Sequence, residues 1–321
     1  MPRELLLLRH GKSDWNRGTE DFHRPLKDRG NRDAERIGVW LHREGLEPHH
    51  WISSPAERAR ITAERCAAAM EQDMRLIQYD DRIYEAGLSP LLSVIAAAPA
   101  DAQRVLLVGH NPGLEDLLIH LTADRVPIHE DGKLLPTATL ARLTMPDDWS
   151  HLSAGCAHLL SITRPGGLPQ MFPFPSPHGQ ELRKRPAYYY RQCAALPYRL
   201  RNGKAEFLVV TSRGRKHWVL PKGIQDPGLK PWEAAAKEAL EEAGIKGELE
   251  PTELGVYRYR KWGADCEVSV FPMAVTRVLD SADWPEHNRR RKWLAPKKVI
   301  ELLEQPKLKS LVKKFQKSLE K

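Results

Sequence analysis

The sequence predicts two domains of different architecture: an N-terminal α/β domain with a mainly parallel sheet, and a C-terminal domain richer in strands. Three observations support this. The 321 residues are too many for one ordinary hydrophobic core. Prolines and glycines crowd residues 165–186, which we interpret as a linker, partly in the polyproline II conformation. Residues 1–164 alternate strand and helix signals, whereas residues 187–321 carry more strand signals.

Short aliphatic runs predict buried strands, and apolar residues at helical spacing predict helices. The N-terminal elements are strands at Leu5–Leu8, Val105–Val108 and Leu159–Ile162, and a helix at Asp33–Arg43. The C-terminal elements are strands at Phe207–Val210, Trp218–Leu220 and Val268–Ala274, and helices at Trp232–Ala243, Lys297–Leu303 and Leu308–Leu319. In a parallel sheet, functional side chains are expected beyond the C-terminal ends of the strands.

The composition is that of a soluble globular protein, with 41% hydrophobic and 29% charged residues. The run Leu5–Leu8 is too short for a signal sequence or a membrane span, so we expect a cytoplasmic protein. The four cysteines lie far apart without a Cys-x-x-Cys pair, which argues against a zinc site or a disulfide framework. The net charge of +8 suits an anionic ligand such as a phosphate, a nucleotide or a nucleic acid.

Two histidines and two arginines of the N-terminal domain stand at strand or helix ends. His10 comes directly after the first strand, with Arg9 beside it, and His110 closely follows Val105–Val108. Arg58 stands at a loop-to-helix boundary, where backbone N–H groups also favour anions. A histidine that accepts a phosphoryl group needs an unprotonated ring nitrogen and several cations around the phosphate oxygens. We therefore expect these four side chains to surround one phosphate.

This arrangement resembles the histidine phosphatase superfamily, specifically its SixA-type phosphohistidine phosphatase branch, over roughly residues 1–164. The supporting segments are Lys12-Ser13-Asp14-Trp15, Arg24-Pro25-Leu26, Gly30, Ser54-Pro55, Val108-Gly109-His110-Asn111-Pro112 and Leu135-Pro136-Thr137. The resemblance implies a three-layer α/β fold, no cofactor, and His10 as the nucleophile. It assigns phosphoryl binding to Arg9, Arg58 and His110, with help from Asn16. Two residues are candidates for the general acid, Asp81 and Glu85, and Asp81 lies nearer the position where larger family members have a glutamate.

Three glutamates share one face of the predicted helix Trp232–Ala243. Glu238, Glu241 and Glu242 have the i, i+3, i+4 spacing that brings side chains together on a helix. Like charges this close repel each other, and a hard divalent cation relieves the repulsion and can also bind substrate phosphates. We expect the loop around Gly223 to turn a carbonyl oxygen toward the same ion.

The segment from Gly223 to Ile245 resembles the Nudix box, G-x5-E-x7-R-E-U-x-E-E-x-G-U, where U is an aliphatic residue. Leu229 replaces the first glutamate, Lys237 replaces the arginine, and Ala239 is a small aliphatic residue. The resemblance covers roughly residues 187–321 and implies an α+β sandwich, pyrophosphate hydrolysis, and Mg²⁺ or Mn²⁺ as the cofactor. The implied metal site consists of Gly223, Glu238, Glu241 and Glu242, with Glu241 also acting in catalysis.

The segments Trp218–Gly223 and Arg289–Leu294 are similar to the Nudix branch that cleaves diadenosine and diphosphoinositol polyphosphates. Lysine and arginine suit such anions, because their N–H groups form charge-assisted hydrogen bonds with phosphate. The residues expected to bind the substrate are Lys222, Arg258, Arg260, Arg289 and Arg291.

Together these observations predict a bifunctional phosphohydrolase that acts on small phosphorylated compounds, with a phosphohistidine protein as a further candidate substrate of the first domain. No membrane partner is expected. One alternative is an RNA 5′ pyrophosphohydrolase or a nucleotide-sanitising enzyme, and activity on triphosphorylated RNA with a steep salt dependence would favour the former. Another is a nucleotide-sensing module with one inactive domain, which would bind nucleotides without turnover.

Overall fold

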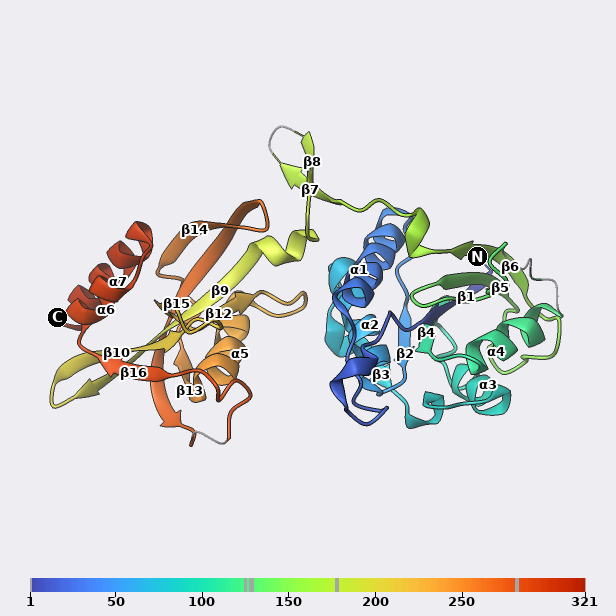
Figure 1. Cartoon of the computed structure of the whole chain (residues 1–321), viewed down its shortest axis with the longest axis horizontal. Coiled ribbons are helices and arrows are strands. Elements are labelled where there is room, and N and C mark those ends of the chain that lie inside the picture. The colour runs from blue at the N-terminus through green and yellow to red at the C-terminus, as the bar shows by residue number, and fades with distance from the viewer. Residues whose placement is uncertain (1, 124–125, 127–129, 177–178, 281–282, 321) are drawn as a thin grey trace. The chain divides into compact units, whose positions relative to one another are not determined.

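The structure is a computed structural model that describes residues 2–123, 126, 130–176, 179–280 and 283–320 (Figure 1). The chain divides into two compact units, Met1–Phe172 and Pro173–Lys321. In each unit, buried apolar residues pack on both faces of a central sheet. No helix in the described ranges is long and apolar enough to cross a membrane.

The first unit is built on a mixed sheet with the strand order β3-β2-β4-β1-β5-β6. Its strands are β1 (Arg3–Arg9), β2 (His50–Ser53), β3 (Ile77–Tyr79), β4 (Arg104–Gly109), β5 (Leu140–Met145) and β6 (His158–Thr163). β1 to β4 pair in parallel, whereas β5 and β6 extend the sheet as antiparallel strands. The parallel pairing brings the C-terminal ends of β1, β2 and β4 to one edge of the sheet.

Helices cover both faces of this sheet, so the unit has three layers. They are α1 (Asp28–Arg43), α2 (Glu57–Ala69), α3 (Leu88–Ala96) and α4 (Gly113–Thr122), with the short 3₁₀ turns η1 (Trp15–Arg17), η2 (Met74–Leu76) and η3 (Asp81–Ile83). Leu5 and Leu7 of β1 pack with residues of α3 and α4, whereas Leu6 and Leu8 pack with residues of α1 and α2. The leucine run is apolar throughout because side chains alternate along a strand and both faces are covered.

The proline-rich stretch is more ordered than the linker predicted from its composition. Its elements are η4 (Pro165–Gly167), β7 (Phe172–Ser176) and β8 (Gly179–Arg183). β7 and β8 pair with each other, and the Arg183 guanidinium lies 3.2 Å from the ring centre of Phe174 and 4.7 Å from that of Tyr190. Such cation–π contacts stabilise the hairpin in a way that composition does not reveal. Pro177 of the predicted linker lies outside the described residues.

The second unit contains a mixed sheet whose two longest strands, β9 and β15, pair in parallel. Its strands are β9 (Arg191–Arg201), β10 (Lys204–Thr211), β11 (Trp218–Val219), β12 (Lys222–Ile224), β13 (Ile245–Leu249), β14 (Gly255–Lys261), β15 (Ala264–Val278) and β16 (Arg291–Leu294). The shorter strands pair antiparallel with their neighbours, and β12 lies against β9. β12 carries Lys222 and Gly223, two of the residues that the sequence analysis expects at the site of the C-terminal domain.

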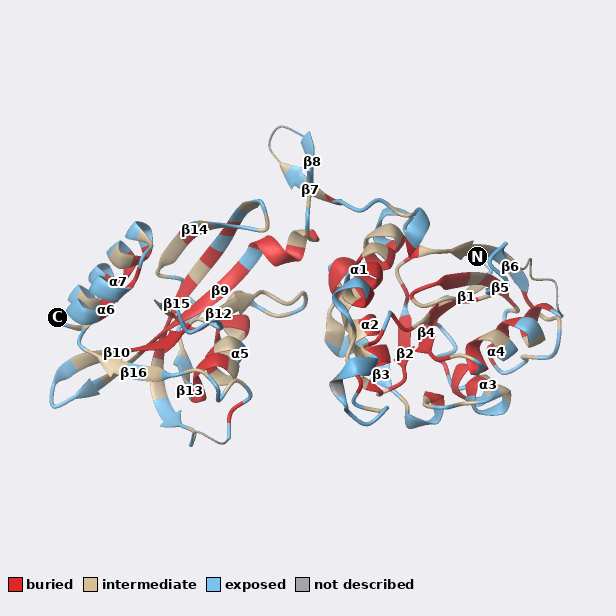
Figure 2. Ribbon diagram, in the orientation of Figure 1, coloured by how far each residue is buried: buried red, intermediate tan, exposed pale blue. Residues whose placement is uncertain are grey.

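Helices also lie on both faces of the second sheet (Figure 1). They are α5 (Pro231–Ala243) on one face, α6 (Pro296–Leu302) and α7 (Pro306–Leu319) on the other, and the short 3₁₀ helix η5 (Ala187–Tyr190) before β9. The buried residues follow the centre of β9 and the inner sides of the helices, while the outer side of α7 is exposed (Figure 2). The unit is therefore an α+β sandwich.

Candidate functional sites

The first site lies where the parallel strands of the first unit end. β1 and β4 are neighbours with Arg9 opposite Gly109, so His10 and His110 leave the sheet side by side. Their ring centres are 5.1 Å apart, and each residue is only 8% exposed. The structure thus brings together two histidines that are distant in the sequence.

The hydrogen bonding of His10 determines which ring nitrogen can react. Its Nδ1 lies 2.7 Å from the carbonyl oxygen of Gly11. Because a carbonyl only accepts, Nδ1 carries the proton of the neutral imidazole and Nε2 keeps its lone pair. Burial lowers the pKa of His10 to about 3, and the charges of Arg58 and Arg9 act in the same direction. His10 is therefore a neutral imidazole near pH 7, with the Nε2 lone pair that a nucleophile needs.

His110 is held on one side only. Its Nε2 lies 2.9 Å from Ser54 Oγ, whereas its buried Nδ1 has no hydrogen-bond partner among the described residues. Burial lowers the pKa of His110 to about 3, with a further contribution from His10. Buried polar atoms are seldom left unpaired, so the vacant Nδ1 is consistent with a partner supplied by a ligand.

Three arginines, Arg9, Arg24 and Arg58, lie close enough to His10 to lower its pKa. Each has at least one buried guanidinium nitrogen without a hydrogen-bond partner in the described part of the chain. Three cations with unused N–H groups beside a neutral histidine form a suitable site for an oxyanion. The sequence analysis assigned Arg9 and Arg58 to this site but gave Arg24 no role, although Arg24 begins one of the supporting segments.

Asp21 joins two of these arginines. Its carboxylate lies 2.8 Å from both Arg24 Nη2 and Arg58 Nη2, and it accepts a hydrogen bond from the Tyr84 hydroxyl at 3.0 Å. Partial burial opposes ionisation, but the Tyr84 hydrogen bond and the two arginines outweigh it and lower the pKa of Asp21. Sequence reasoning missed Asp21 and Tyr84, because no local pattern indicates that these segments meet.

The two predicted general acids lie away from these contacts. Asp81 begins η3 and Glu85 follows it, and both side chains are exposed, as is that of Asn16. In the described ranges, none of the three forms a hydrogen bond or an ion pair with His10 or Arg58. The carboxylate that the structure does place among the site's arginines is Asp21.

The second site lies on α5 and the adjoining strand β12. Gly223 was expected in a loop, but it belongs to β12 and pairs with Cys193 of β9. The Glu238 carboxylate lies so close to Gly223 that a Cβ built there would be 2.0 Å from Oε1. Burial, with smaller contributions from the charges of Glu242 and Glu241, raises the pKa of Glu238 to about 8. Crowded carboxylates of this kind suit Mg²⁺ or Mn²⁺, which prefer oxygen ligands.

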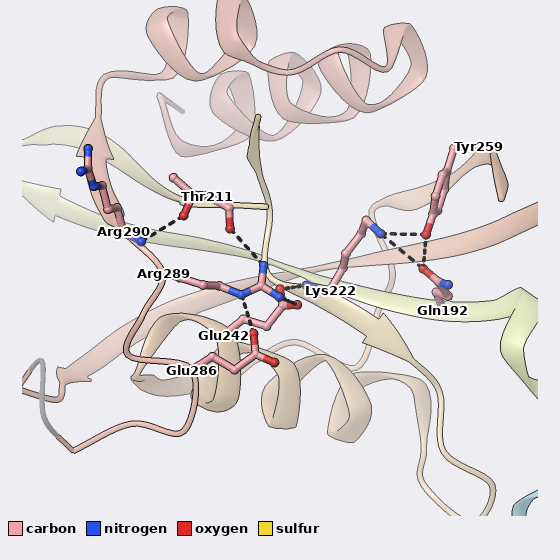
Figure 3. A network of polar contacts seen from close by, with 8 residues as sticks. All are labelled: Gln192, Thr211, Lys222, Glu242, Tyr259, Glu286, Arg289 and Arg290. Atoms are coloured by element: carbon pink, nitrogen blue, oxygen red, sulfur yellow. Dashed lines mark hydrogen bonds and ion pairs between the residues drawn. The ribbon is translucent and has the colours of Figure 1, made fainter. Parts of the chain in front are cut away.

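Glu242 is held by two donors (Figure 3). Arg289 Nη2 donates to its Oε1 at 2.5 Å, and the Lys222 backbone N–H donates to its Oε2 at 3.0 Å. In the part of the chain that the structure describes, no three His, Cys, Asp or Glu side chains are grouped so that they could hold a metal ion as they stand. The donor chemistry fits a divalent cation, but the carboxylates have to converge before they can enclose one.

A cavity of about 200 Å³ opens beside Lys222. The Lys222 ammonium donates to the Tyr259 hydroxyl at 2.9 Å and to Gln192 Oε1 at 3.4 Å (Figure 3). Burial lowers the pKa of Lys222. Much of the remaining wall is aromatic or aliphatic and includes Trp218, Leu220, Tyr257, Leu303 and Leu308. Lys222 therefore connects two features of the site. Its backbone contacts the acidic cluster formed by Glu238, Glu241 and Glu242, and its side chain lines the cavity.

Two of the predicted substrate-binding arginines lie on the other face of β14. Arg258 pairs with Glu267 at 2.7 Å, and both Arg258 and Arg260 are exposed. Tyr257 and Tyr259, which line the cavity, alternate with these arginines along the strand. Because successive side chains of a strand point to opposite faces, Arg258 and Arg260 point away from the cavity.

Arg291 supports α5 instead of facing the cavity. It donates to the Ala243 carbonyl at 2.8 Å and to the Gly244 carbonyl at 3.2 Å, and also to the Leu279 carbonyl. The carbonyls at the C-terminal end of a helix lack partners within the helix, so this arginine stabilises the end of α5. Of the five basic residues predicted to bind substrate, Lys222 lines the cavity and Arg289 contacts the acidic cluster.

Comparison with known proteins identifies both units. The model of the histidine phosphatase superfamily (branch 1) matches residues 5–91, and the model of the NUDIX domain matches residues 191–315. The chain is 31% identical over 122 residues to diphosphoinositol polyphosphate phosphohydrolase 3-alpha of Mus musculus, covering 37% of this chain and 72% of that protein. The chain therefore belongs to the Nudix hydrolases through its second unit and to the histidine phosphatase superfamily through its first. Both are hydrolase families, and the predicted families and fold class are confirmed.

Two further relatives cover one unit each. Nudix hydrolase 12, mitochondrial, of Arabidopsis thaliana is 40% identical over 108 residues, covering 31% of this chain and 52% of that protein. The chain thus spans about half the length of this relative. A solved structure from Agrobacterium tumefaciens, provisionally assigned as the phosphohistidine phosphatase SixA, is 32% identical, covers 52% of this chain and 100% of that one, and has a TM-score of 0.42.

Proposed function

We propose that the chain is a bifunctional phosphohydrolase with one reaction in each unit. In the first unit, Nε2 of His10 attacks phosphorus, and the leaving group departs with the bonding electrons and takes a proton from solvent. Water then attacks the phosphohistidine and releases inorganic phosphate. The unused N–H groups of Arg9, Arg24 and Arg58 bind the phosphoryl oxygens. This proposal depends chiefly on the neutral, buried His10, whose Nδ1 is already bonded to Gly11.

The His10→Ala variant of the full chain tests this assignment. We expect it to lose activity toward a phosphohistidine peptide while pyrophosphate hydrolysis continues, because the two reactions use different units. His158→Ala serves as a control, since this exposed histidine lies on β6. A second measurement uses the wild-type enzyme and a ³²P-labelled substrate. When the reaction is quenched soon after mixing, the enzyme should carry acid-labile, base-stable label on His10. Label on another residue, or an active His10→Ala variant, would exclude the proposed nucleophile.

The second unit acts as a metal-dependent pyrophosphohydrolase under this proposal. Glu238, Glu241 and Glu242 would hold a divalent cation, which supplies charge neutralisation and water activation when bound. The absence of a side chain at Gly223 leaves room for the Glu238 carboxylate. Arg289 Nη2 and the Lys222 backbone N–H donate hydrogen bonds to the Glu242 carboxylate. The acidic face of α5, with its elevated glutamate pKa values, supports the metal dependence.

The substrates that best suit the cavity are nucleoside polyphosphates, including diadenosine polyphosphates. Aromatic walls such as those formed by Trp218 and Tyr257 can stack on a nucleobase, and the Lys222 ammonium suits the attached phosphates. An inositol ring with several phosphates would need cations on many sides. Arg258 and Arg260, which would have supplied some of them, point away from the cavity.

A substrate panel with Mg²⁺ tests this choice. Diadenosine tetraphosphate and pentaphosphate should show higher kcat/KM than nucleoside diphosphate compounds, a diphosphoinositol polyphosphate or 5′-triphosphorylated RNA. Lys222→Ala should raise KM for the diadenosine compounds, whereas Lys246→Ala, an exposed lysine on β13, should not. The highest kcat/KM for the inositol compound or for RNA would overturn the substrate assignment without affecting the metal dependence.

The compartment that we propose is the cytoplasm. All four cysteines are free, and Cys66, Cys193 and Cys266 are buried. Proteins of reducing compartments keep their thiols in this form. Cell fractionation with an antibody against the chain would test the proposal, and enrichment in a membrane or an oxidising compartment would contradict it.

A further inference from the structure

The segment between β15 and β16 brings a glutamate and an arginine to the acidic end of α5. The Glu286 backbone N–H donates to the Glu241 carbonyl at 3.1 Å, which attaches this segment to the last turn of the helix. Three residues later, Arg289 reaches the Glu242 carboxylate, which is 47 positions away in the sequence. Figure 3 shows the Arg289 side chain beside both Glu242 and Glu286. This contact is long-range, so no local sequence pattern reveals it.

All three nitrogens of the Arg289 guanidinium are used. Nη2 donates to Glu242 and Nε to Glu286, each at 2.5 Å, and Nη1 donates to the Thr211 carbonyl at 3.0 Å. The Arg289 side chain is only 8% exposed. One rigid guanidinium therefore fixes two carboxylates against strand β10. A lysine lacks this planar fork, because its ammonium is a compact charge on a flexible stem.

The Nudix box itself lacks the groups that would perform these tasks. Lys237, at the position of the motif's arginine, lies 2.5 Å from Asp226 Oδ2 and is engaged there. Leu229, at the position of the motif's first glutamate, is apolar and packs against the core beneath α5. The box of this chain therefore supplies neither an arginine for Glu242 nor the auxiliary carboxylate.

We propose that the segment before β16 replaces both missing groups: Arg289 is a positioning residue that orients Glu242 for metal binding, and Glu286 supplies the auxiliary carboxylate. Glu286 is suited to this because its side chain is 40% exposed and its Oε2 is held by Arg289. The inference rests on the proposed metal-dependent function of the second unit. Residues that orient metal ligands typically change metal affinity about 10- to 100-fold when mutated.

Titration of the metal-free full-length protein with Mn²⁺, followed by electron paramagnetic resonance, measures this affinity without reference to catalysis. Arg289→Ala should weaken Mn²⁺ binding about 10- to 100-fold, and Arg289→Lys by a smaller factor because the charge remains. Glu286→Gln should weaken binding several-fold. Arg290→Ala is the matched control. The Arg290 side chain is exposed in the same segment, and the residue contacts Thr211 Oγ1 through its backbone N–H, which alanine keeps.

Thermal unfolding of each variant separates positioning from general instability. Wild-type Mn²⁺ affinity in a cooperatively unfolding Arg289→Ala variant would overturn the inference. Tighter binding would also overturn it, since Arg289 would then be a competitor of the metal. If the Arg289→Ala variant does not fold, the other two variants decide the matter. Wild-type Mn²⁺ affinity in both Arg289→Lys and Glu286→Gln would then overturn the inference. Failure of the wild-type second unit to bind Mn²⁺ would refute the proposed metal-dependent function itself, so the two failures are distinguishable.

Discussion

Replacing Gly223 by alanine should disable the acidic cluster and leave the fold nearly intact. The new Cβ would lie 2.0 Å from Glu238 Oε1 and 2.1 Å from its Cδ, far inside van der Waals contact. The atoms it meets are the end of a flexible side chain, so Glu238 can rotate away while the backbone stays in place. Gly223 does not have a left-handed φ, so alanine adds no backbone strain at this position.

The expected magnitudes follow from this geometry. Overpacking a core typically costs about 1–3 kcal/mol, but here we expect less than about 1 kcal/mol, because Glu238 can leave the clash and become solvated. Burial raises the pKa of Glu238 to about 8, so moving this carboxylate into water relieves an unfavourable desolvation. The loss of one metal ligand should lower kcat/KM for pyrophosphate hydrolysis at least about 100-fold, or roughly 2.7 kcal/mol of transition-state stabilisation.

Differential scanning calorimetry with and without Mg²⁺, together with steady-state kinetics on diadenosine tetraphosphate, measures both effects. The matched control is Gly214→Ala in the same unit, where an added Cβ would meet no atom within 4 Å. The control should keep wild-type stability and activity. The reasoning fails if Gly223→Ala keeps wild-type kcat/KM, because the close approach of Glu238 would then be irrelevant. It also fails if the variant unfolds at ordinary temperature, because the backbone would then have had to move.

Three further predictions concern pH, anion binding and chelation. In metal-free protein, the free energy of unfolding of the second unit should fall as pH rises from about 4.5 to about 8, because Glu238 stays protonated to a higher pH when folded. Urea titrations at several pH values measure this dependence, and Glu238→Gln should reduce it. Arg24→Ala should lower phosphatase kcat/KM about 100- to 1,000-fold, because it removes a donor that stabilises the oxyanion. The control Arg29→Ala, at an exposed arginine, should keep wild-type kcat/KM, and comparable losses in both variants would contradict a specific role of Arg24. EDTA should abolish pyrophosphate hydrolysis and spare the phosphatase reaction, and loss of both would contradict the separation of the two sites.

The sequence predicted best those features whose signals are local. The aliphatic runs of β1 and β4 are recognisable because strands covered on both faces are apolar throughout. The three glutamates of α5 are recognisable because helical spacing alone places them on one face. His10 and His110 could be predicted at one site because each follows one of two parallel strands of the same sheet, and the C-terminal ends of parallel strands lie together.

The tertiary structure decided which of the charged side chains act together. Asp21 joins Arg24 and Arg58 through contacts between segments that no local pattern connects. Arg258 and Arg260 share the positive charge expected of a substrate site, yet the alternation of side chains along β14 points them away from the cavity.

In the Nudix box, too, some features follow from local spacing in the sequence, and others follow from contacts between distant residues. Its spacing alone determined that Glu238, Glu241 and Glu242 would share a helical face, because backbone hydrogen bonds within a helix fix that geometry. Only the folded chain determined that Arg289 would hold Glu242 while Lys237 turned to Asp226. An ion pair depends on where two distant backbones are brought together, and the packing of the sheet and helices decides that position.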